Sequence, residues 1–168
     1  MITFTHPPRT AGEKETLVGF LEAQRAILAW KLDGLTEEDA RRAMVPSGTS
    51  MLGLVKHMAW VERWWFVEFI GGGSPAYPWS ESDPDAGWRI EDDETIASIT
   101  RLYADAIAEA NGEIDKAESL ELTGIVRDTE RSLRWTLVHM IEETARHAGH
   151  ADIIREMIDS TTGYLPGD

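Results

Sequence analysis

The chain has 168 residues, with 16 lysines and arginines against 30 aspartates and glutamates, so its formal net charge is −14. This acidity argues against nucleic acid or anionic lipid as a partner, because both would repel the protein. The sequence has no cysteine, which excludes disulfides, thiolate metal ligands and a cysteine nucleophile. Residues 1–10 lack the apolar run of a signal peptide. We expect a single soluble, cytoplasmic domain over residues 1–168.

Apolar residues recur at helical spacing in the first half of the chain. The first segment runs from about residue 12 to residue 35, and Thr36 opens a short helical turn after it. Ser50 is a good N-cap for a second long helix that runs to Ile70. Three glycines at positions 71–73 are expected to end that helix, because glycine holds helical order poorly.

The stretch from Ser74 to Asp93 shows no helical or strand period. It contains three prolines, several acidic residues, Trp79 and Trp88. A loop of this length without its own regular structure is often functional. We therefore expect it to form a lid or a pocket wall.

Two more helical segments follow, from about residue 93 to residue 117 and from Leu133 to Ser160, the latter capped by Ser132. Between them lies a polar connection with a short extended stretch at 120–126. Four amphipathic helices joined by polar connections predict an all-α four-helix bundle. The sequence has seven tryptophans, and we expect Trp30 and Trp135 to pack in the core.

The last helix carries polar side chains on its apolar strip. At ~100° per residue, His139, His147 and His150 all lie within about 40° of Glu143. Glu143 and His147 are four residues apart, so their side chains lie one above the other and could bind one ion. Taken alone, this spacing is more often an exposed polar pair or a Glu–His hydrogen bond.

His57 lies on an apolar strip of the second long helix. Alone it would be read as a core histidine that is hydrogen-bonded to a neighbour. Together with Glu143 and His147, it can supply the third of three metal ligands. Two imidazoles and one carboxylate suit Zn²⁺ with an open fourth position, and they equally match the facial triad of non-haem iron.

These segments resemble the DinB/YfiT-like superfamily, and especially its actinobacterial branch, the domain of unknown function 664. The resemblance covers nearly the whole chain. The matching segments are Leu54-x-x-His57, Trp60-x-Glu62 and residues 142–152.

Most of that superfamily has three histidine ligands, and Glu143 stands where one of them would be. Mycothiol-dependent maleylpyruvate isomerase is similar in using His, Glu and His on zinc. The resemblance therefore implies His57, Glu143 and His147 as metal ligands. His150 stands where many relatives carry glutamine.

The resemblance also implies an up-down-down-up bundle that holds a divalent metal, zinc first, with nickel and iron open. It implies a low-molecular-weight thiol such as mycothiol or bacillithiol as cosubstrate. We predict a metal-dependent thiol S-transferase or isomerase, whose partners are that thiol and an electrophilic substrate. Two alternatives stay open: a hydrolase using metal-activated water, and a non-catalytic metal-binding or stress-response protein. A homodimer is also open, and no catalytic residue is assigned.

The thiol site is expected close to His57. Trp60 and Trp64 lie within two turns of it on the same side of the helix. We predict that these tryptophans and His150 contribute to cofactor binding, with core packing an equal alternative for Trp60 and Trp64. His150 or His139 would orient a ligand or relay a proton.

Overall fold

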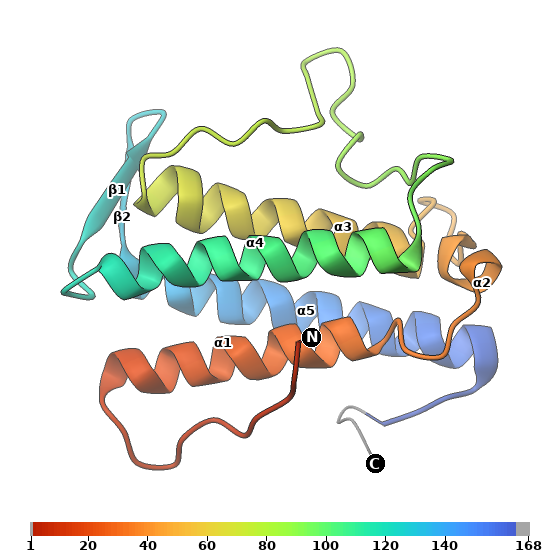
Figure 1. Ribbon diagram of the computed structural model, residues 1–168, viewed down its shortest axis with the longest axis horizontal. Coiled ribbons are helices and arrows are strands. Elements are labelled where there is room, and N and C mark those ends of the chain that lie inside the picture. The colour runs from red at the N-terminus through yellow and green to blue at the C-terminus, as the bar shows by residue number, and fades with distance from the viewer. Residues whose placement is uncertain (1, 164–168) are drawn as a thin grey trace.

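The structure is a computed structural model that describes residues 2–163. Figure 1 shows its long helices lying side by side along one axis. The elements, in chain order, are α1 (Glu13–Trp30), α2 (Glu37–Arg41), α3 (Met51–Glu62), the π-helix η1 (Arg63–Ile70), α4 (Ile96–Lys116), β1 (Thr123–Val126), β2 (Thr129–Ser132) and α5 (Leu133–Asp159).

The described part of the chain is mostly helical, as predicted. α1 and α5 run in one direction, while the continuous α3–η1 segment and α4 run in the other (Figure 1). α1 packs mainly on α5 and α3 packs mainly on α4, and α3 also contacts α5. The core between them includes Leu28, Phe66, Tyr103 and Met140. Among the described residues, no helix is long and apolar enough to cross a membrane.

The predicted helix caps at Thr36, Ser50 and Ser132 are confirmed. In each case the hydroxyl oxygen accepts a hydrogen bond from the backbone N–H three residues later, at 3.1–3.2 Å. The predicted start of the third long helix near Asp93 is wrong. α4 begins at Ile96, because Thr95 forms a capping box with Ser98.

The three glycines end the second long helix where they were expected to. The N–H of Gly71 donates to the carbonyl of Phe66, five residues back, at 2.9 Å. This spacing is that of the π-helix, which the sequence pattern does not reveal. Gly72 then reverses the chain with a φ of 68°, a left-handed conformation that glycine adopts without strain.

The prediction of an all-α fold is wrong at one place, where β1 and β2 form an antiparallel hairpin before α5. Its two-residue turn consists of Arg127 and Asp128, both with positive φ (51° and 61°). Such turns usually carry Asn-Gly or Asp-Gly, and that signal is missing here. At Gly124, an added Cβ would lie 1.7 Å from the Phe69 carbonyl oxygen, so the hairpin backbone packs directly on the end of η1.

The two tryptophans expected in the core lie elsewhere. Trp135 is 43% exposed. Its ring stacks on His139, and the guanidinium of Arg131 lies over the same ring, 4.5 Å from its centroid. Trp30 is half-buried under the ammonium group of Lys31. Trp65 on η1 is buried in their place. Helical spacing thus predicted which side of each helix is apolar, but not which residues at the margin of that side are buried.

Candidate metal centre

α3 and α5 bring together the three residues that were predicted to bind a metal. One ligand atom each from His57, Glu143 and His147 lies within 4.8 Å of the other two. Nε2 of His147 is 3.2 Å from a carboxylate oxygen of Glu143, and the rings of His57 and His147 have centroids 5.2 Å apart. The metal-ligand role of these residues stays a prediction, but their proximity across two helices is a property of the fold.

Burial keeps both imidazoles of this cluster neutral at neutral pH. Burial, with a smaller contribution from the neighbouring His147, lowers the pKa of His57 to about 3. Burial also lowers the pKa of His147, against the opposing effect of Glu143. Neutral rings have a free lone pair for a cation. Nδ1 of His147 is buried, and among the described residues it has no hydrogen-bond partner.

This donor set fits a divalent ion. Two imidazole nitrogens and one carboxylate oxygen are a common ligand set for zinc and for non-haem iron. Ligand atoms on a tetrahedral zinc lie about 3.3 Å apart. The distance between Nε2 of His147 and the nearer carboxylate oxygen of Glu143, 3.2 Å, is close to this value. The second oxygen of Glu143 lies 3.2 Å from the guanidinium of Arg146, so the first oxygen is the one directed at the histidines.

The loop before α4 covers one face of His57. The ring of Trp88 stacks on the imidazole, with centroids 3.7 Å apart and planes 10° apart. The loop backbone touches α3 one turn earlier: a Cβ added to Gly53 would lie 2.6 Å from the carbonyl oxygen of Trp88. The loop therefore holds the imidazole in one orientation.

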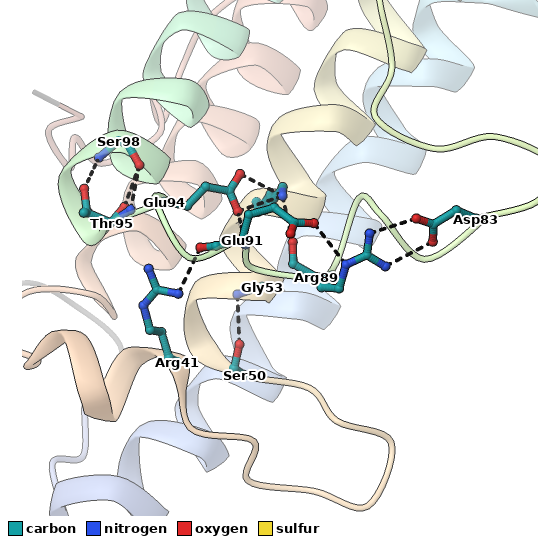
Figure 2. Close-up of polar contacts among 10 residues, drawn as sticks. Arg41, Ser50, Gly53, Asp83, Arg89, Glu91, Glu94, Thr95 and Ser98 are labelled. Atoms are coloured by element: carbon teal, nitrogen blue, oxygen red, sulfur yellow. Dashed lines mark hydrogen bonds and ion pairs between the residues drawn. The ribbon is translucent and has the colours of Figure 1, made fainter.

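A buried lysine fixes the end of this loop. Nζ of Lys56 donates to the carbonyl of Arg89 at 2.7 Å and pairs with Glu94 at 2.7 Å. Figure 2 shows the guanidinium of Arg89 between the carboxylates of Asp83 and Glu91. The sequence reasoning missed Lys56, although a lysine inside an apolar helix strip beside His57 was a usable signal.

A cavity of about 490 Å³ lies beside the histidine cluster, with His57 and Glu143 in its wall. This volume is typical of small-molecule sites. Trp60 and Trp64, for which pocket lining and core packing were equal alternatives, both line it and are half-buried. Its other aromatic walls are Trp65, Trp79 and Trp88. The long loop is thus a wall of the pocket, as expected.

The two remaining histidines of α5 differ in position. His139 lines the cavity, and burial lowers its pKa. His150 is exposed and does not line it, although its ring centroid is 5.6 Å from that of His147. Arg127 also lines the cavity, and sequence reasoning missed it because its place depends on the hairpin.

The fold and this donor cluster define a helical protein with a candidate metal centre at the wall of an aromatic pocket. The model of the mycothiol S-transferase family matches residues 16–160, and the chain belongs to this family. This confirms the DinB-like resemblance. The comparison with curated proteins gives no match. A solved structure of a conserved protein from Enterococcus faecalis is similar in fold, with a TM-score of 0.64 and 14% identity over 90% of this chain and 100% of that one.

Proposed function

We propose that the chain is a metal-dependent transferase that moves a low-molecular-weight thiol of the mycothiol type onto an electrophile. The observation that carries the proposal is the convergence of His57, Glu143 and His147 beside the aromatic cavity. Membership of the mycothiol S-transferase family supports the thiol. The donor set supports a divalent ion, with zinc as the first candidate.

A divalent ion held by these residues would lower the pKa of a thiol in contact with it, so that the nucleophilic thiolate forms at neutral pH. The protein's own side chains orient the site. Arg146 holds one oxygen of Glu143, and Trp88 stacks on His57. The tryptophans of the cavity wall give a bound substrate an apolar surface to pack against. Because the chain has no cysteine, the sulfur must come from the cosubstrate.

We also propose that the long helices form an up-down-down-up four-helix bundle and that the chain is one domain. The helix directions in Figure 1 support this arrangement. The continuous core, to which α1, α3, η1, α4 and α5 all contribute, supports the single domain. In this arrangement the candidate ligands belong to neighbouring helices of one bundle, which is where bundle proteins build metal sites.

Metal analysis of protein purified without a histidine tag tests the proposal. We expect one divalent ion per chain, with His57→Ala losing most of it and His150→Gln keeping it. An unchanged metal content in His57→Ala would contradict the assignment. The same preparations should consume thiol in the presence of chloroacetamide faster than metal-free protein does. Bound metal without thiol-dependent turnover would favour the hydrolase or the non-catalytic alternative.

A further inference from the structure

Arg127 is the cationic residue among those that line the cavity. It lies at the tip of the β1–β2 hairpin, while the candidate metal ligands come from α3 and α5. Within residues 2–163, no carboxylate lies within ion-pair distance of its guanidinium, in contrast to Arg63, Arg89 and Arg134. The cavity therefore has a positive charge in its wall, on an exposed side chain that makes no ion pair within the described part of the protein.

The backbone at Arg127 is unusual for an arginine. Its φ of 51° lies in the left-handed region, where glycine, asparagine and aspartate are favoured and other side chains are strained. Strain of this kind is commonly found at functional sites, where the side chain has a task. The hairpin that carries this turn is held against the bundle, because Gly124 packs against the carbonyl of Phe69 and β2 leads directly into α5.

A second donor without a partner belongs to a residue of the cavity wall. Nε1 of Trp60 is buried and, among the described residues, has no hydrogen-bond acceptor. A buried donor without a partner is rare in native structures and indicates a missing ligand or water. The residues of the cavity wall thus include the exposed guanidinium of Arg127 and the buried indole N–H of Trp60. Of these two, the guanidinium is the donor that a negatively charged ligand in the cavity can reach.

We propose that Arg127 binds the carboxylate of the electrophilic substrate, so that small organic acids are the substrate class of this transferase. This inference rests on the proposed function and assigns the second substrate of the same site. The net charge of −14 disfavours the approach of carboxylates, so a cation in the cavity wall would favour their binding there. Glu143 is held by Arg146 and His147 and does not pair with Arg127.

A halogenated acid illustrates the balanced reaction. With chloroacetate, the thiolate sulfur forms a bond to the methylene carbon while the carbon–chlorine bond breaks. Chloride leaves with the electron pair, and the proton of the thiol is released to solvent. The carboxylate keeps its charge throughout, so Arg127 can hold it before and after the transfer.

The test is a binding measurement that does not depend on turnover. Metal-loaded protein is titrated with phenylacetate and with its neutral analogue phenylacetamide, and quenching of tryptophan fluorescence reports binding. We expect the wild type to prefer the acid at least about tenfold, as for a charged hydrogen bond of about 1.4 kcal/mol or more. Arg127→Asn should reduce this preference to about twofold or less.

Asparagine is chosen because it is neutral and tolerates positive φ, so the turn should keep or gain stability. Arg131→Gln is the matched control, since it removes a cation from the same hairpin at a residue that does not line the cavity. It should keep the preference. The proposal is wrong if the wild type shows no preference, if Arg127→Asn keeps it, or if Arg131→Gln loses it equally. The second of these outcomes is also the one expected if the acid binds only to the metal.

The kinetic test uses chloroacetate and chloroacetamide with the same thiol. Arg127→Asn should lower kcat/KM for the acid at least about tenfold and change the value for the amide less than about twofold. Equal losses for both electrophiles would overturn the assignment. Absence of turnover with either electrophile would contradict the proposed function but leave the binding result for Arg127 intact.

Discussion

Two buried polar clusters share the α3–η1 segment, and they differ in whether their polar atoms are satisfied. At the junction of α3 and η1, the buried Arg25 donates to both carboxylate oxygens of Glu62 at 2.7 and 2.5 Å. Its remaining terminal nitrogen donates to Glu22 and Asn111, and Asn111 donates back to Glu22. These four residues tie α1, α3 and α4 together. Within the described part of the chain, none of their side chains has a buried polar atom without a partner, so the cluster needs no ligand.

The histidine cluster on the same segment is not complete. Its one internal hydrogen bond is the 3.2 Å contact between His147 and Glu143, and Nδ1 of His147 has no partner among the described residues. Burial disfavours protonation of both rings, so they remain lone-pair donors. The comparison teaches that buried polar groups with all partners present belong to the architecture, whereas a buried lone pair without a partner is free to bind a ligand, an ion or a water.

The largest expected effect comes from breaking the complete cluster. Glu62→Ala leaves the guanidinium of Arg25 buried without its main partner, which typically reduces the free energy of unfolding by about 3–5 kcal/mol. Urea unfolding measures this loss. Glu109→Ala is the control, because it breaks the more exposed pair with Arg63 and should cost about 1 kcal/mol or less. A small effect of Glu62→Ala would show that the cluster adapts to the loss.

The second prediction concerns metal removal, which acts on the incomplete cluster. An ion that binds only the folded state stabilises it by about 2.7 kcal/mol at a free concentration one hundred times its Kd. Chelation should therefore lower the melting temperature, and adding the divalent ion back should restore it. His57→Ala should lose this response, and Glu109→Ala should keep it. A response that survives in His57→Ala would place the ion elsewhere.

Much of the candidate site could be predicted because it lies on regular helices. The helical period places Glu143 and His147 on one strip of α5 and His57 on the inner strip of α3. The hydroxyl caps at Ser50 and Ser132 set where those helices begin. Once both helices pack in one core, the proximity of the three residues follows.

The rest of the site depends on segments without a periodic pattern. Arg127 reaches the cavity only through a hairpin whose turn lacks the usual glycine. Trp88 reaches His57 because Lys56 fixes the loop from inside α3. Trp135 was expected in the core but is 43% exposed. These features are set by tertiary contacts, which spacing in the sequence does not encode.

The third prediction concerns the pH dependence of the metal-free protein. The pKa of His57 is lowered to about 3 in the folded state, whereas an unfolded histidine has a pKa of about 6.5. Between these values the unfolded state binds more protons, so the free energy of unfolding falls as the pH falls. From pH 7.5 to 5.5 the expected loss is about 1.4 kcal/mol. Urea unfolding at the two pH values measures this change. In His57→Gln, the free energy of unfolding should fall by about 1.4 kcal/mol less than in the wild type. An equal fall in both proteins would assign the pH dependence to other groups.

The smallest expected effect on stability comes from shortening the loop that forms a wall of the cavity. Replacing residues 76–82 by Gly-Ser removes Trp79, which packs edge-on against Trp60, but keeps Trp88 on His57 and the buried Ala86. Because most of the removed residues are exposed, the free energy of unfolding should change by about 1 kcal/mol or less.

Circular dichroism should therefore show unchanged helix content, and metal content should also stay the same. The affinity for phenylacetamide should fall, because the cavity loses one aromatic wall while Arg127 and the candidate ligands stay in place. Trp135→Ala is the matched control: it also removes one indole, but from an exposed residue that does not line the cavity, and should leave the affinity unchanged. Loss of helix content in the shortened protein would show that the loop is part of the core. The loop would then be needed beside the histidine cluster for folding, and not as a wall of a ligand-binding cavity.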